Sequence, residues 1–174
     1  MKFRMPSWDD GAEAWADFLR AYSQHLEGLR DALPAHVLEL ARLPGMDDGL
    51  IVETVHDRAE RVLRLTLLCG DLQMGYYDLK LIYEDAEITP EHAQRLARLA
   101  HDTPSEHGPE VSRHEVDVTK NGQIEHRIEF HDKEPNSWFA IRCSALTWET
   151  VSCPDRKILT LCARFSGRPD AATE

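Results

Sequence analysis

The sequence predicts an α+β fold: an antiparallel sheet of about six or seven strands, an N-terminal helix pair and one inserted helix packed on it. Apolar and polar residues alternate in two neighbouring runs, Leu63–Cys69 and Tyr77–Tyr83, which indicates two strands with one buried face each. Near the N-terminus, apolar residues recur instead at spacings of three and four, as on one side of a helix. The connections between successive strand-like runs are short, which favours antiparallel pairing.

Length and composition fit one globular domain. We expect residues 1–165 of the 174 to form it and residues 166–174 to be a disordered tail. Acidic residues outnumber basic ones 31 to 20, for a net charge of −11, which argues against a nucleic-acid partner. The chain shows neither a signal-peptide pattern nor an apolar run of membrane-spanning length. We therefore expect a cytoplasmic protein with reduced cysteines and no membrane partner.

Two helices are predicted at the start of the chain. The first runs from Ser7, where Ser7 and Asp10 resemble a capping box, to Leu33. Its apolar stripe comprises Trp15, Phe18, Leu19, Tyr22, Leu26 and Leu29. We expect this stripe to lie on the protein's own sheet. The second, shorter helix is predicted from Pro34 to Leu43.

The inserted helix has the clearest start signal. Thr89 is a suitable N-cap, Pro90 fits the first helical position, and Glu91 favours the positive end of the helix dipole. A strand over Leu50–His56 precedes the two alternating runs and completes a three-stranded meander. We expect the long N-terminal helix and the Thr89 helix to cover one face of the sheet.

A hairpin is predicted over residues 110–130, around Lys120-Asn121-Gly122. A two-residue turn would put the apolar residues of its strands on opposite faces. A three-residue loop with Gly122 in the left-handed conformation avoids this conflict. It pairs Val118 with Ile124, Val116 with His126, Glu115 with Arg127, and Arg113 with Glu129. We predict this second register.

Two further strands are predicted, over Trp138–Glu149 and Lys157–Phe165. The apolar positions of the first change from odd to even numbers near Ser144-Ala145, and a β-bulge there would reconcile them.

Two histidines are the candidate ligand residues. In the predicted register, His114 and His126 lie diagonally on one face, close enough to contact one metal ion or ligand. The alternative is that both are half-buried strand residues with ordinary hydrogen bonds. The sequence has no Gly-flanked nucleophile and no glycine-rich phosphate loop, and we expect no cofactor.

A surface for a protein partner is predicted at the loop Gly70–Gly75 and the acidic end of the following strand. Loop residues of apolar, amide and aromatic type stand here among acids, a composition found in interfaces. The predicted partner-binding residues are Asp71, Gln73, Met74, Tyr76, Glu84 and Asp85. Alternatively, Leu72 and Met74 fold back onto the core.

A family resemblance points the same way. The chain has an N-terminal helix, a strand ending in His56-Asp57, and then the segments VLRLTLLCGD, YYDLKLIYEDAEI and EHRIEFHD. In this order of features, roughly residues 48–131 resemble small bacterial α+β proteins, including immunity proteins that neutralise polymorphic toxins. The resemblance implies an acidic partner for a basic toxin. Such proteins share no catalytic residues, so it assigns no roles.

These observations leave three functional hypotheses. The first is a non-enzymatic, acidic protein-binding module, an immunity or inhibitor protein with a basic partner. The second is a metal- or small-ligand-dependent enzyme that uses His114 and His126. The third is a homodimeric structural module that uses an exposed sheet edge.

Overall fold

Strands are the most common element of the described chain. The computed structural model describes residues 2–3, 6, 8–43, 45–71, 75–101, 110–131 and 138–153. Within these ranges the elements are η1 (Trp8–Asp10), α1 (Gly11–Gly28), α2 (Ala35–Leu40), β1 (Leu50–Asp57), β2 (Val62–Asp71), β3 (Gly75–Glu84), α3 (Pro90–His101), β4 (Val111–Val118), β5 (Ile124–Phe130), β6 (Trp138–Cys143) and β7 (Ala145–Ser152). The predicted α+β class is confirmed.

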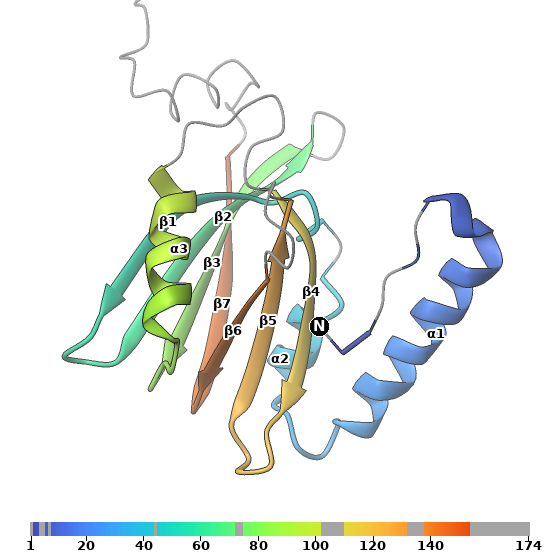
Figure 1. Cartoon of the computed structure of the whole chain (residues 1–174), viewed down its shortest axis with the longest axis horizontal. Coiled ribbons are helices and arrows are strands. Elements are labelled where there is room, and N and C mark those ends of the chain that lie inside the picture. Colours follow the sequence, from blue (N-terminus) through green and yellow to red (C-terminus); the bar gives the residue numbers. More distant parts are fainter. Residues whose placement is uncertain are drawn as a thin grey trace, which may run out of the picture.

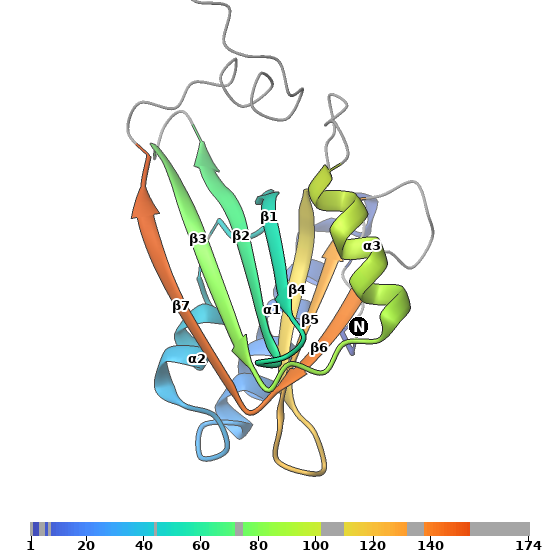
Figure 2. The same cartoon turned by 90° about the vertical axis from the view of Figure 1, so that its left-hand side faces the viewer.

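The seven described strands form two antiparallel sheets. One has the strand order β1-β2-β3-β7 and the other β4-β5-β6. Figure 2 shows the four-stranded sheet on the left and the three-stranded sheet on the right. Isolated bridges link the two, between Leu50 and Glu110 and between Glu87 and Arg142. Both edges of the three-stranded sheet, next to β4 and at β6, are thereby joined to the four-stranded sheet.

The predicted single strand over Trp138–Glu149 is wrong. β6 ends at Cys143 and pairs with β5, whereas β7 begins at Ala145 and pairs with β3. The chain therefore passes from one sheet to the other at Ser144, whose N–H donates to the Glu84 carbonyl at 3.0 Å. The change in apolar phase marks this passage instead of a bulge. The predicted strand over Lys157–Phe165 and the predicted tail lie outside the described residues.

The predicted hairpin register is confirmed. Val118 pairs with Ile124, and Glu115 with Arg127, as the three-residue loop requires. Gly122 has a φ of 80°, and its N–H donates to the Thr119 carbonyl at 3.0 Å. The left-handed glycine therefore sets which side chains share a face.

The core lies where the apolar faces of the two sheets meet α2 and α3. On β2 and β3 the predicted alternation holds except at Leu68, which is buried as well. Leu65 and Leu81 are directly paired and fully buried. The other sheet contributes Val116, Ile124, Ile128, Phe130, Phe139 and Ile141, and the helices contribute Val37, Leu40, Leu96 and Leu99. Burying each such side chain stabilises the fold by about 1.5–3 kcal/mol.

The prediction that the two long helices cover one face of the sheet is wrong. Figures 1 and 2 show α1 and α3 on opposite sides of the three-stranded sheet. α3 begins as expected, because the Thr89 hydroxyl accepts the His92 N–H at 3.2 Å. The His92 ring lies 5.6 Å from that of Phe139 on β6, on the apolar face of the sheet. α1 lies on the other side.

Candidate functional site

α1 begins at Gly11 and ends at Gly28, so it is shorter than predicted; Ser7, its predicted cap, lies outside the described residues. Of its 18 residues only Leu26 is buried, and Leu19 is 57% exposed. Figure 1 shows the first turns of α1 standing apart from the strands. The apolar stripe of α1 is therefore covered by the sheet only toward its C-terminal end.

A cleft of about 310 Å³ opens beside this partly exposed stripe. The α1 side is largely apolar, with Trp15, Phe18, Leu19 and Tyr22. The opposite side comprises Arg42, Leu43 and Asp47 from the segment after α2, and Arg113, His114 and Glu115 from β4. We call this site the α1–β4 cleft. It combines an aromatic wall with a floor of hydrogen-bonding groups.

A buried chain of hydrogen bonds ends at this floor. The Tyr83 hydroxyl lies 2.9 Å from His126 Nδ1, and His126 Nε2 lies 3.2 Å from His114 Nδ1. The three residues come from β3, β5 and β4, and Tyr83 and His126 are fully buried. His114 also lines the α1–β4 cleft. The chain thus connects the core to the cleft.

Burial keeps this chain uncharged at neutral pH. It lowers the pKa of His114 to about 4 and the pKa of His126 well below its ordinary value, to which neighbouring His114 contributes further. Burial also raises the pKa of Tyr83 well above that of a free tyrosine. The histidines therefore act as neutral hydrogen-bonding groups.

The predicted proximity of His114 and His126 is confirmed, and the structure accounts for it as a hydrogen bond. Among the described residues, no group of three or more metal-ligating side chains occurs. A metal at this pair stays a prediction. The sequence reasoning missed Tyr83, although a tyrosine at a core-facing strand position implies a buried partner for its hydroxyl.

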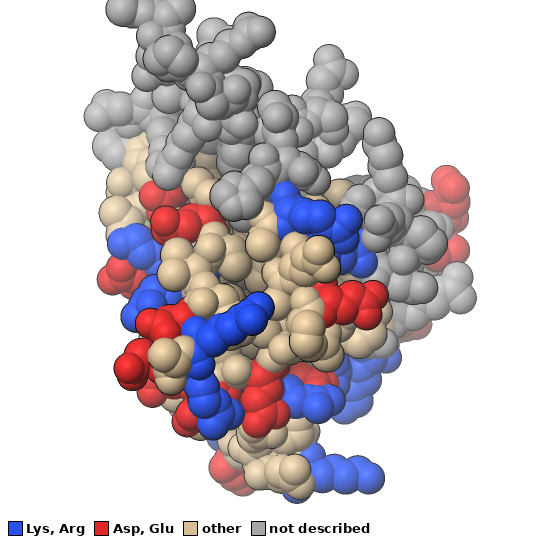
Figure 3. All heavy atoms as spheres, turned by 60° about the vertical axis from the view of Figure 1, so that its left-hand side comes forward, with Lys and Arg blue, Asp and Glu red and all other residues tan. Residues whose placement is uncertain are grey.

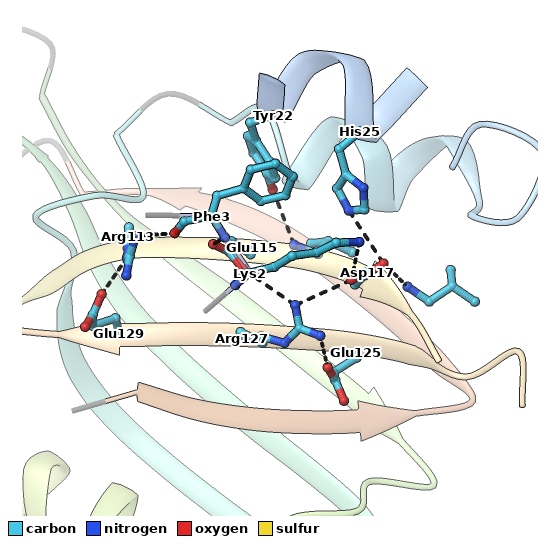
Figure 4. Close-up of polar contacts among 12 residues, drawn as sticks. Lys2, Phe3, Tyr22, His25, Arg113, Glu115, Asp117, Glu125, Arg127 and Glu129 are labelled. Carbon is cyan, nitrogen blue, oxygen red and sulfur yellow. Dashed lines mark hydrogen bonds and ion pairs between the residues drawn. The ribbon is translucent and has the colours of Figure 1, made fainter. Parts of the chain in front are cut away.

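Next to the cleft, β4 holds residues from the start of the chain (Figure 4). Glu115 accepts hydrogen bonds from the N–H groups of both Lys2 and Phe3, at 2.7 and 2.9 Å. The Arg113 guanidinium donates to the Phe3 carbonyl at 2.6 Å. Glu115 is only 3% exposed, so few water molecules reach its carboxylate. These contacts fix the main chain of Lys2 and Phe3 on the sheet.

The side chains of these two residues are held as well. Lys2 Nζ lies 3.2 Å from Asp117 Oδ2. The Phe3 ring lies 5.5 Å from Tyr22 and 5.1 Å from His25, both on α1. We call Tyr22, His25, Arg113, Glu115 and Asp117 the N-terminal cradle.

Further charged pairs extend the N-terminal cradle across the sheet. Arg127 lies 3.6 Å from Glu115 and 3.5 Å from Asp117, and it also bonds Glu125, which Arg142 contacts at 2.7 Å. Burial by itself would raise the pKa of Asp117, but the Val118 N–H and Lys2 outweigh it and the pKa is lowered. Asp117 therefore stays ionised at neutral pH.

The described members of the predicted partner-binding set lie at two ends of the β2–β3 pair. Asp71 and Tyr76 lie at one end of the β2–β3 pair, and Glu84 ends β3 at the other, roughly 26 Å away. Asp85 accepts a hydrogen bond from the Ser144 hydroxyl at 2.8 Å and lies 3.5 Å from Arg61. Gln73 and Met74 lie outside the described residues. In the face shown in Figure 3, acidic and basic side chains are interspersed.

Comparisons with protein families, curated proteins and solved structures give no match to this chain. In the part of the chain that the structure describes, no helix is long and apolar enough to cross a membrane.

Proposed function

We propose that the protein is a non-enzymatic binding module that receives a segment of a partner protein in the α1–β4 cleft. The observation that supports this proposal is the incompletely buried α1 stripe at the cleft, where Leu19 is 57% exposed and Trp15 and Phe18 are half-buried. An amphipathic helix normally buries its whole apolar stripe, and an open one offers a partner apolar area. Tryptophan, tyrosine and arginine, all present here, are the residue types that contribute most binding energy in interfaces.

The charge of the chain favours a basic partner. The net charge of the chain is −11, whereas the lining of the α1–β4 cleft itself is balanced, with Asp47 and Glu115 beside Arg42 and Arg113. Opposite charge speeds the encounter of two proteins and is screened by salt. An immunity or inhibitor protein acting on a basic toxin in the cytoplasm is the form of this function that the sequence resemblance favours. The binding surface differs from the one predicted from the sequence.

Site-specific photocrosslinking tests this proposal. A photoreactive benzoylphenylalanine replaces Leu19 at the cleft or, as a matched control, Val151 on β7, which are 57% and 41% exposed. In extract of the source cells, position 19 should give one adduct of defined mass that weakens as salt rises. Unlabelled wild-type protein should suppress the adduct, and an unlabelled Leu19→Arg variant should not. Equal labelling from both positions, or none from position 19, would contradict the proposal.

A second candidate function is the binding of a small ligand with His114 as a fixed hydrogen-bonding group. The cleft volume of about 310 Å³ supports it, because small-molecule sites have about 300–1,000 Å³. Native mass spectrometry of the purified protein should then show a bound compound that a His114→Phe variant loses. The mass of the protein in solution separates both functions from the homodimeric module predicted from the sequence.

A further inference from the structure

We propose that the N-terminal cradle recognises an extended peptide segment in which a lysine or arginine is followed by an aromatic residue. The chain's own Lys2 and Phe3 occupy the cradle and compete with such a segment. This inference rests on the proposed function, since it names the chemistry of the partner segment that binds beside the α1–β4 cleft. It starts from the way in which the cradle holds Lys2 and Phe3.

The main-chain contacts are those of a peptide-binding site. The two carboxylate oxygens of Glu115 each accept one N–H of two successive residues, and Arg113 donates to the carbonyl of the second. Such contacts bind any main chain of the right shape, whichever protein supplies it. Glu115 is 3% exposed, and besides these two N–H groups the Arg127 guanidinium lies 3.6 Å from its carboxylate. A buried carboxylate of this kind requires donors, and a partner's main chain can supply them.

The side-chain contacts specify which segment fits. Asp117 takes the cation of the first residue at 3.2 Å, and a carboxylate would be repelled there. Tyr22 and His25 take the ring of the second residue between α1 and the sheet (Figure 4). The ring packs edge-on against Tyr22, and such aromatic pairs gain stability beyond the area that they bury. A cation followed by an aromatic residue therefore satisfies both positions.

The location connects the cradle to the α1–β4 cleft. Tyr22, Arg113 and Glu115 belong to both sites, so a segment that enters the cleft reaches the cradle next. An incoming segment exchanges one set of equivalent contacts for another, and no buried charge is left unpaired. The internal segment has the advantage of being tethered, which lowers the apparent affinity of a free peptide. Removing its side chains should therefore strengthen peptide binding.

The test uses the full chain and the capped tetrapeptide Gly-Lys-Phe-Gly, with amide chemical shifts of β4 as the readout. A Lys2→Gly/Phe3→Gly variant should bind this peptide about tenfold or more tightly than wild type does. In the same background, Glu115→Gln should abolish binding, whereas Glu149→Gln, an exposed carboxylate on β7, should leave it unchanged. The charge-reversed peptide Gly-Glu-Phe-Gly should not bind.

A second measurement requires no weakened variant. In this measurement, 4-fluorophenylalanine replaces Phe3 in the otherwise wild-type chain. As Gly-Lys-Phe-Gly is added, the fluorine chemical shift should move to the value of a solvent-exposed ring. No peptide binding by a folded Lys2→Gly/Phe3→Gly variant, or equal binding of Gly-Glu-Phe-Gly, would overturn the inference. If crosslinking from position 19 still succeeds, the proposed function stands and only the cradle's role falls. If both fail, both proposals are wrong.

Discussion

At the scale of single residues, the chain Tyr83–His126–His114 shows how polar groups are accommodated between apolar strands. Burying a hydroxyl or an imidazole is unfavourable unless it is hydrogen-bonded, and here each group bonds the next at 2.9 and 3.2 Å. A protonated imidazole at either histidine would be far less favourable than the neutral one, because burial disfavours the charge. Because the charged form of each imidazole is disfavoured in the folded chain, the pKa values of both histidines are lowered. The stability of the protein therefore depends on pH.

We predict that the free energy of unfolding decreases as pH falls from about 7.5 to about 5.5. The unfolded chain binds protons at His114 and His126 near their ordinary pKa of 6.5, while in the folded chain His114 does so only near pH 4. The unfolded state thus binds more protons between these values, and acid favours it. Urea unfolding at both pH values measures the decrease, which a His114→Gln/His126→Gln variant should largely lose.

The carboxylates of the cradle provide the control. Asp117 has a lowered pKa, so the stability that it contributes is present above its ordinary value of 3.8 and is lost only in stronger acid. An Asp117→Asn variant should therefore keep the wild-type decrease between the two pH values. Parallel behaviour of wild type and the double histidine variant would show that the histidine pair is not the cause.

The histidine pair and the N-terminal cradle were predictable from the sequence to different degrees. The hairpin register followed from sheet alternation, and it correctly placed His114 near His126. The cradle was not predictable, because Lys2 and Glu115 are 113 positions apart and no periodic pattern relates them. Periodicity shows which face of a strand a side chain occupies, but not which distant segment covers that face.

At the scale of elements, local signals predicted best where one residue determines the backbone. The helix start at Thr89 and the hairpin loop at Gly122 are both of this kind. The extent and packing of α1 were predicted less well, since an apolar stripe does not say how much of it will be covered. The passage from β6 to β7 at Ser144 was also missed, because exchanging sheets depends on tertiary pairing.

Two glycines allow the role of local conformation to be measured. We predict that Gly122→Ala lowers the free energy of unfolding by about 1–2 kcal/mol, because a φ of 80° strains a residue with a Cβ. Gly28→Ala at the end of α1 should instead raise it by about 0.5–1 kcal/mol, since alanine favours the helix. An added Cβ meets no atom within 4 Å at either site.

Urea unfolding of both variants beside wild type tests this pair. Because neither site is crowded, the two changes should differ in sign for conformational reasons alone. Unchanged stability of Gly122→Ala would mean that the hairpin loop does not depend on the left-handed glycine. A loss of stability in Gly28→Ala would contradict the expectation for the helix end.

At the scale of the whole molecule, a short seam joins the start of β1 to β4. The Asp48 N–H donates to the Val111 carbonyl at 2.7 Å, and the Val111 N–H donates to the Gly49 carbonyl at 2.9 Å. The same stretch of chain carries Asp47, which lines the α1–β4 cleft. The position of the cleft relative to the two sheets therefore depends on this seam.

Gly49 is the residue at which the seam can be tested. A Cβ there would lie 2.8 Å from the Met46 carbonyl oxygen and 2.9 Å from Cys69 Sγ. The first contact is with backbone, so relief requires the chain itself to move. We predict that Gly49→Ala lowers the free energy of unfolding by about 1–3 kcal/mol, as overpacking typically does. Amide exchange at Val111 should become faster.

The Gly28→Ala variant is the matched control, because it adds the same methyl group where nothing is displaced. An unchanged rate of amide exchange at Val111 in Gly49→Ala would show that the hydrogen bonds of the seam are kept when the chain adjusts. If the seam does open, the β4 side of the α1–β4 cleft moves with it, and crosslinking from position 19 should weaken in Gly49→Ala but not in Gly28→Ala. The stability of the fold and the binding of the partner would then depend on the same few hydrogen bonds between the start of β1 and β4.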